Sequence, residues 1–176
     1  MDEGRTLPCL RRKRYWRSIH FRIGDSEQRL VLTAAVLNHI ALHQQIGQAS
    51  PEAGGQLFAR FRNNQIRVER ATGPRAVDQR SRYGYVPDRF AEQKEIDEMH
   101  NRGLHFIGDW HTHPERLPRP SPSDVHSIRQ AFKQSKHHLN GFLLLIAGTE
   151  VFPHGLFVSL YDSLGEVAVV LDLFAC

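Results

Sequence analysis

Gly108-Asp-Trp-His-Thr-His-Pro-Glu-Arg-Leu-Pro-Arg-Pro-Ser-Pro-Ser-Asp124 is the stretch that decides the fold and function of this 176-residue chain. It places His111 and His113 at the end of an apolar segment that is predicted to be a buried strand. Residues i and i+2 of an extended chain point to the same side, so both imidazoles can face one point in space. Asp124 follows His113 after eleven positions and completes a set of three N/O ligands.

Two imidazoles and a carboxylate, without a thiolate, form a ligand set that suits zinc. Three protein ligands leave one coordination position for water, which indicates a catalytic site and not a structural one. A zinc hydrolase also needs a base for the proton of that water. Glu52 in Ser50-Pro-Glu-Ala-Gly-Gly55 is the best candidate, because it heads a predicted hydrophobic strand and small residues beside it allow close approach.

These residues resemble the JAMM/MPN metallopeptidases, in which a strand-borne glutamate precedes H-x-H-P, a serine and an aspartate at fixed spacing. The match consists of Glu52, His111-Thr-His-Pro114, Ser121 and Asp124, and the resemblance extends over residues 30–175. It implies that His111, His113 and Asp124 bind Zn2+ and that Glu52 is the general base. It also implies that Ser121 helps to stabilise the tetrahedral oxyanion.

Length and composition predict one soluble domain, residues 18–176, preceded by a basic arm at residues 1–17. Cys9 and Cys176 lie at opposite ends of the chain, which argues against a disulfide framework and favours a reducing, cytoplasmic compartment. No apolar run approaches the roughly 20 residues that cross a bilayer, so no membrane association is expected. The net charge of +4 is concentrated in the arm, which is interpreted as a solvated segment.

Hydrophobic periodicity and turn residues predict an alternation of strands and helices. Strands are expected at 18–23, 30–32, 52–61, 65–71, 104–110, 141–147, 155–161 and 166–174, and helices at 34–45, 88–101 and 121–136. Asn63-Asn64 is expected to form the hairpin turn, and residues 72–85 an irregular connection that is a candidate for substrate contact. This order predicts an α/β protein, a mixed β-sheet flanked by helices as in the MPN fold, in a cytidine-deaminase-like arrangement.

Three helix starts and several histidines have simpler interpretations. Thr33, Asp88 and Ser121 are predicted N-caps, and Asp124 then falls in the first turn of its helix, which is compatible with metal binding. His39 and His43 lie one helical turn apart and are interpreted as boundary residues, not as a metal pair. His126 is interpreted as an ordinary exposed helix residue, with a hydrogen bond to a metal ligand as the alternative. The His137-His138 pair at the end of the helix is interpreted as complementing the helix dipole, not as binding metal.

The resemblance also implies a substrate class. Many JAMM proteases cut the isopeptide bond between a ubiquitin-like C-terminus and a lysine. The segment around Arg80-Ser-Arg82, followed by Gly108-Asp-Trp-His, is similar to the JAMM proteases of bacterial CBASS anti-phage operons, which reverse conjugation of a cGAS-like nucleotidyltransferase. The expected partner is therefore the C-terminal tail of a conjugated protein, and nucleic acid is not expected to be one.

Three alternatives stay open on the sequence. The first is a peptidase that processes the C-terminus of a ubiquitin-like or sulfur-carrier protein. The second is a RadC-like, DNA-associated protein, which shares H-x-H-P and P-S-x-x-D but normally has Asn-His-Pro-Ser-Gly where this chain has Thr-His-Pro-Glu-Arg. The third is an inactive MPN scaffold; such proteins typically lack a ligand, and here none is missing.

Overall fold

Ten strands and three helices follow one another along residues 17–172, the part of the chain that the computed structural model describes. The predicted basic arm lies outside the described residues, except for Arg17. The strands are β1 (Ile19–Ile23), β2 (Arg29–Leu32), β3 (Gly54–Arg62), β4 (Gln65–Ala71), β5 (Gln79–Ser81), β6 (Gly84–Val86), β7 (His105–Thr112), β8 (Phe142–Ala147), β9 (Leu156–Tyr161) and β10 (Glu166–Leu171). The helices are α1 (Ala34–Ala41), α2 (Arg89–Asn101) and α3 (Pro122–Gln134).

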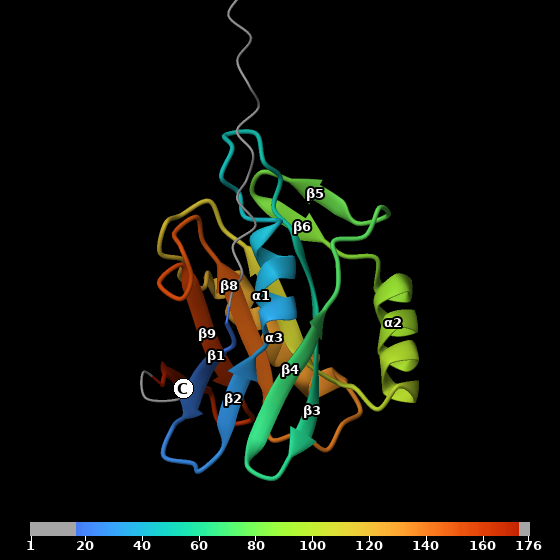
Figure 1. Cartoon of the computed structure of the whole chain (residues 1–176). Coiled ribbons are helices and arrows are strands. Elements are labelled where there is room, and N and C mark those ends of the chain that lie inside the picture. Colours follow the sequence, from blue (N-terminus) through green and yellow to red (C-terminus); the bar gives the residue numbers. More distant parts are fainter. Residues whose placement is uncertain (1–16, 173–176) are drawn as a thin grey trace, which may run out of the picture.

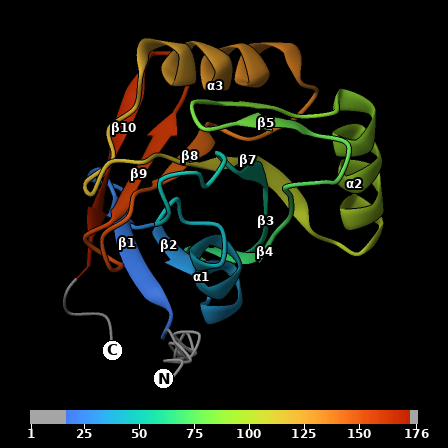
Figure 2. The ribbon, with the colours of Figure 1, turned by 90° about the horizontal axis from the view of Figure 1, so that it is seen from above.

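The main sheet is mixed, as predicted, and it closes on itself (Figure 1). Its strands follow the order β1-β10-β9-β8-β7-β3-β4-β2, and β2 returns to β1. The β2–β4 and β7–β8 pairs are parallel, whereas the other neighbours are antiparallel. Viewed from above, α2 and α3 lie outside the ring of strands, with β5 of the small β5–β6 hairpin between them (Figure 2). The predicted α/β class is therefore confirmed.

Separate apolar clusters hold the helices on the two faces of the sheet. The largest lies inside the curved sheet and includes Val36, Leu37 and Ile40 of α1. A second cluster, on the outer face, packs Ile128 of α3 against β8. A third packs Met99 of α2 against β3. Burial of an aliphatic side chain of this size stabilises the fold by about 2 kcal/mol.

Several local predictions need correction. The first helix ends at Ala41 and not at 45, and the Thr33 side chain makes no capping hydrogen bond. Residues 72–86 are not irregular throughout, because they contain the β5–β6 hairpin. The third helix ends at Gln134 and not at 136, so His137 and His138 follow it. The strand predicted at 166–174 ends at Leu171, and residues 173–174 lie outside the described residues. The other predicted strands lie within two residues of their expected bounds, and the Asn63 turn and the two remaining N-caps are found where expected.

Strand β7 contains an irregularity that sets which residues face outward. Leu57 of β3 pairs with Gly108, but the next residue of β3 pairs with Phe106, so Ile107 is an extra residue in β7. Ile107 and Trp110, three positions apart, consequently both enter the interior cluster. From Trp110 onward the strand alternates regularly, and His111 therefore points to the outer face.

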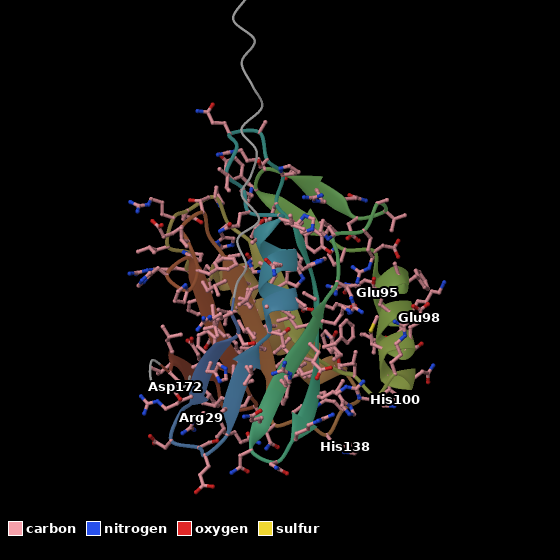
Figure 3. All side chains as sticks on the ribbon, viewed as in Figure 1. Arg29, Glu95, Glu98, His100, His138 and Asp172 are labelled. Atoms are coloured by element: carbon pink, nitrogen blue, oxygen red, sulfur yellow. The ribbon has the colours of Figure 1, made fainter. Side chains whose placement is uncertain are left out.

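The two ends of the described chain meet beside β1. Arg29 at the start of β2 forms an ion pair with Asp172, which follows β10, at a distance of 3.5 Å between Nε and Oδ2 (Figure 3). The Asp172 backbone N–H also donates to the His20 carbonyl of β1. None of the helices within residues 17–172 combines the length and the apolar character needed to span a membrane.

A buried carboxylate fixes the β5–β6 hairpin to α2. Asp78, whose side chain is 0% exposed, accepts hydrogen bonds from the backbone N–H groups of Arg75 (2.6 Å) and Asp88 (2.9 Å) and from the Tyr85 hydroxyl (2.9 Å). Burial alone would raise the pKa of Asp78, but these hydrogen bonds outweigh it and hold the pKa below its usual value. The Arg75 guanidinium in turn contacts Gln56 of β3 and Glu95 of α2.

The close approach of β8 at Gly108 predicts that a side chain is not tolerated there. A Cβ on Gly108, which has φ +139°, would lie 2.0 Å from the Leu143 carbonyl oxygen. We expect Gly108→Ala to lower the free energy of unfolding by about 4 kcal/mol, because strain and overlap add. Gly165→Ala is the matched control: its φ is +151° with nothing within 4 Å, so only strain of about 1–2 kcal/mol is expected. Equal losses in urea denaturation would contradict the steric argument.

The role of Asp78 predicts a pH-dependent loss of stability. Asp78→Asn should lower the free energy of unfolding by about 3 kcal/mol at pH 7, because three buried donors lose their charged acceptor. A carboxylate with a lowered pKa stabilises the fold above its unfolded pKa and loses this effect as pH falls, so wild type and variant should converge below about pH 4. Urea denaturation across this range measures the difference. Asp97→Asn, at an exposed acid of α2, should leave the stability nearly unchanged.

Candidate active site

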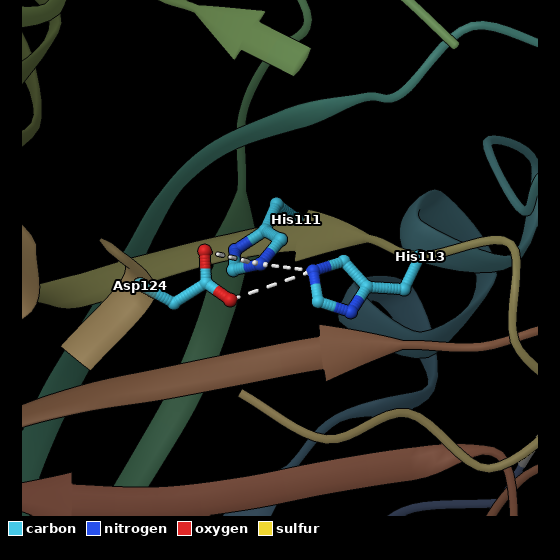
Figure 4. A group of neighbouring side chains, drawn as sticks. All are labelled: His111, His113 and Asp124. Atoms are coloured by element: carbon cyan, nitrogen blue, oxygen red, sulfur yellow. Dashed lines mark hydrogen bonds and ion pairs between the residues drawn. The ribbon is translucent and has the colours of Figure 1, made fainter. Parts of the chain in front are cut away.

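The two histidines and the aspartate singled out in the sequence converge on one point (Figure 4). The Nε2 atoms of His111 and His113 are 3.1 Å apart. The Oδ1 atom of Asp124 lies 3.4 Å from Nε2 of His111, and its Oδ2 atom lies 3.5 Å from Nε2 of His113. Among residues 17–172 this is the one group of three or more His, Cys, Asp or Glu side chains whose ligand atoms could share a metal ion.

Each of these side chains is positioned by its secondary structure. His111 is in β7 and His113 directly follows it, so both project from the outer face, on either side of the buried Thr112. Asp124 is the third residue of α3, where a capping box forms: the Ser121 hydroxyl accepts from the Asp124 N–H, and the Asp124 carboxylate accepts from the Ser121 N–H. The cap fixes the Asp124 carboxylate and turns it toward β7.

Charge complementarity within this group is strong. Burial would raise the pKa of Asp124, but hydrogen bonds from His111 and His113 lower it far below its usual value. Burial would lower the pKa of His113, but Asp124, Glu115 and Glu52 raise it above its usual value. The surroundings therefore favour an ionised Asp124 and a positive charge beside it, which a divalent cation would supply while both imidazoles ligate in their neutral form.

The donor set also fits zinc by its chemistry. It consists of two imidazole nitrogens and a carboxylate oxygen, and the side chains are only 12–17% exposed. The Nδ1 atom of His113, on the far side of the ring, lies 3.4 Å from Glu115 Oε2, a contact that orients a ligating imidazole. Three such donors leave a coordination position for another molecule.

Glu52 lies in the same cleft as this group. His111, Asp124 and Glu52 all line it, and burial raises the pKa of Glu52, although His111 and His113 oppose the rise. The strand β3 begins at Gly54, so Glu52 precedes the strand and does not head it as predicted. Its backbone is held instead by the hairpin: the Glu52 N–H donates to the Ser81 carbonyl (2.7 Å), and Arg80 Nε donates to the Glu52 carbonyl (2.7 Å).

The glycine pair of this segment allows a close approach, but to the connection after β4 and to the hairpin, and not to the predicted metal site. A Cβ on Gly55 would lie 1.8 Å from the Thr72 carbonyl oxygen. A Cβ on Gly54 would lie 2.6 Å from the Tyr85 ring. The two glycines therefore let the connection after β4 and the β5–β6 hairpin close directly over β3.

The predicted oxyanion residue has a clear structural role and an untested catalytic one. The Ser121 hydroxyl caps α3 and lies 2.8 Å from the Ser123 hydroxyl. Within the described part of the chain, the cleft is lined on this side by Ser127 and Ile128 of α3, and Ser121 is not among its lining residues. The contribution of Ser121 to catalysis stays a prediction.

The remaining predicted histidines do not join the site. His39 and His43 stack edge-on at 5.3 Å between ring centroids, and both rings contact Trp110. His39 Nε2 donates to the Gly73 carbonyl (2.7 Å), and burial, followed by the charge of His39, lowers the pKa of His43 to about 4. His126 is exposed on α3. The interpretation of the His39–His43 pair as boundary residues agrees with these contacts.

The structure adds cleft residues that the sequence analysis missed. Asp109, two positions before His111, faces the same cleft as Tyr85 and Glu92. Burial, reinforced by Glu92, raises the pKa of Asp109 to about 7. Alternation along β7 could have placed Asp109 beside His111. The participation of Tyr85 and Glu92 depends on the hairpin and on α2, and no motif indicated it.

Comparison with known proteins places this site in a family. The chain is 30% identical over 131 residues to a protein of Vibrio cholerae named CD-NTase/cGAS isopeptidase, covering 73% of this chain and 81% of that protein. A protein of Escherichia coli with the same name is 29% identical over 108 residues, covering 60% of this chain and 69% of the relative. A solution structure of a Desulfitobacterium hafniense protein has the same fold, with a TM-score of 0.54, 23% identity, and coverage of 80% of this chain and 88% of that one. Residues 33–159 match the model of the prokaryotic homologs of the JAB domain, and the chain belongs to this family.

Proposed function

We propose that this chain is a zinc-dependent isopeptidase that cleaves the bond after the C-terminal residue of a conjugated protein. The observation that carries the proposal is the convergence of His111, His113 and Asp124 beside a cleft that Glu52 lines together with His111 and Asp124. These residues come from three separate segments, and neither fold stability nor helix capping requires Glu52 and the histidines to meet. A metal-assisted hydrolysis uses all four groups.

The roles follow from the chemistry of each group. His111, His113 and Asp124 would hold Zn2+, which when bound acidifies water and polarises a carbonyl. Glu52 accepts the proton of the attacking water and passes it to the leaving amine, and its burial raises its pKa. Ser121 donates a hydrogen bond to the developing oxyanion. The α3 cap and the hairpin keep these groups in place while the proton moves.

The substrate class is taken from the names of the relatives. Proteins of Vibrio cholerae and Escherichia coli are named CD-NTase/cGAS isopeptidases, so we propose that the substrate is a cGAS-like nucleotidyltransferase joined through its C-terminus to a target in a CBASS anti-phage system. The leaving group is then a lysine amine. We further propose residues 18–176 as the catalytic domain and the β5–β6 hairpin as a substrate contact, because Tyr85 lines the cleft.

A cleavage assay with paired substrates tests the reaction. The C-terminal tail of the nucleotidyltransferase is supplied both as a lysine conjugate and as a linear fusion to a reporter, with zinc present. We expect cleavage of the conjugate at the bond after the tail. Cleavage of the fusion alone would favour a processing peptidase, and no cleavage of either would contradict the proposal.

Replacing the base should stop turnover without releasing the metal. We expect Glu52→Gln to lower kcat by about 100-fold or more, because the proton of the attacking water loses its acceptor. Zinc content, measured by elemental analysis, should equal that of wild type. Glu98→Gln, at an exposed acid of α2, is the control and should leave kcat unchanged. A fully active Glu52→Gln variant would remove Glu52 from the mechanism.

Replacing a proposed ligand should weaken zinc binding, whereas replacing Glu52 should not. We expect His113→Ala and Asp124→Ala each to lower zinc affinity by at least about 100-fold, since each removes one of three donors and leaves the other two incompletely held. Activity should fall with occupancy. Isothermal titration of the metal-free variants with zinc measures this effect, and an unchanged affinity would exclude these residues as ligands.

A further inference from the structure

Gln45 is a buried amide that ties together three segments around the proposed active site. Its side chain is 3% exposed, although it lies in a loop after α1. The Nε2 group donates to the carbonyl of Ser50 (3.2 Å) and to the carbonyl of Arg82 (2.8 Å). The Oε1 atom accepts from the Thr112 hydroxyl (3.2 Å). One side chain thus joins the loop before Glu52, the turn of the hairpin and the strand of the histidines.

The Thr112 hydroxyl extends this connection to the residue beside the base. Thr112 is 0% exposed and points into the interior, between the outward-facing His111 and His113. Its Oγ1 atom accepts from the Ala53 N–H (3.0 Å), and its backbone N–H donates to the Ala53 carbonyl (2.8 Å). Because Oγ1 accepts from Ala53, its own proton is directed to Gln45. A chain of hydrogen bonds therefore runs from the Ala53 N–H through the Thr112 hydroxyl to the Gln45 side-chain oxygen.

The Gln45 side chain also binds the β5–β6 hairpin, which in turn binds the backbone of Glu52. Ser81 and Arg80 bind the Glu52 backbone, and the next residue, Arg82, gives its carbonyl to Gln45. Glu52 is thus fixed on one side through β5 and on the other through Ala53. Both attachments lead back to Gln45, which is not among the residues that line the cleft in the described part of the chain.

We propose that Gln45 and Thr112 are positioning residues that set the distance between the Glu52 carboxylate and the His111–His113–Asp124 group. This proposal rests on the function proposed above. Neither residue contacts the reacting atoms; they act through the backbone of residues 50–53 and through the hairpin. Misplacement of a catalytic group by about 1 Å is sufficient to cost on the order of 100-fold in rate.

The neighbouring glutamine supplies a matched control. Gln44 Nε2 donates to the carbonyls of Gly148 (2.7 Å) and Glu150 (3.1 Å), so Gln44→Ala also removes an amide with two hydrogen bonds to the backbone. We expect Gln45→Ala to lower kcat by about 10- to 100-fold at nearly constant KM and constant zinc content. Gln44→Ala should stay within about 3-fold of wild type. Equal activities of the two variants would overturn the proposal.

Substitutions at Thr112 test the same connection without a glutamine. Thr112→Val removes the hydroxyl and keeps the shape, and it should lower kcat as Gln45→Ala does. Thr112→Ser retains the hydroxyl and should recover most of the activity. In the double variant Gln45→Ala/Thr112→Val, the loss should be close to that of the more affected single variant, because both interrupt one chain. Multiplicative losses would show that the two residues act separately.

Amide hydrogen exchange provides a measurement that needs no substrate. In Gln45→Ala and Thr112→Val, the protection of the Glu52 and Ala53 amides should fall by about tenfold or more, and in Gln44→Ala it should not change. Unchanged protection would overturn the proposal even if kcat fell. Lower protection at unchanged kcat would show a purely structural role, which also overturns it. If wild type cleaves no conjugate, the proposed function fails, and the exchange data still decide whether these residues fix the Glu52 segment.

Discussion

The arrangement of the site depends on the packing of β7 between β3 and β8. The extra residue Ile107 shifts the alternation of β7, so that Trp110 and Thr112 fill the interior while His111 points outward. In a regular strand, Ile107 and His111 would face the same side, and the first histidine would enter the apolar core. Gly108 permits this shift at a point where the Leu143 backbone of β8 leaves no room for a side chain. The proposed ligands are therefore placed by a local departure from regular pairing.

A second constraint is that the proposed base and the proposed ligands belong to segments far apart in the chain. Glu52 precedes β3, and its backbone is bound by the hairpin and, through Ala53, by Thr112. Residues of α3 contribute the carboxylate through a capping box that would stabilise the helix in any case. Glu52 and Asp124 are thus each held in place by hydrogen bonds to the backbone of their own or a neighbouring segment. The narrow range of hydrogen-bond distances and angles limits how far these side chains can move.

Two buried carboxylates near the cleft differ in how far neighbouring groups offset the cost of burying their charge. Asp78 beside the hairpin is surrounded by hydrogen-bond donors, and Asp109 of β7 is not. Asp78 is surrounded by donors, and Arg75 contacts Glu95, so this cluster fixes the hairpin onto α2. Asp109 instead has a pKa raised by burial and by Glu92, and no hydrogen bond to its carboxylate is formed within residues 17–172. Such a contrast between structural and cleft carboxylates is typical of functional sites, where binding is favoured over stability.

The sequence by itself predicted that His111, His113 and Asp124 lie together, the mixed α/β class and nearly all strands and helices, because each depends on local spacing: i and i+2 at the end of β7, a cap before Asp124, a turn at Asn63. It also indicated Glu52 as the candidate base, which lines the same cleft as His111 and Asp124. The tertiary structure decided how the sheet closes, that residues 72–86 contain a hairpin, that Asp109 and Tyr85 line the cleft, and that Gln45 joins the segments around it. These features depend on contacts between residues distant in the chain, such as the Gln45 amide and Thr112, and local periodicity carries no information about which distant segment a polar side chain will meet.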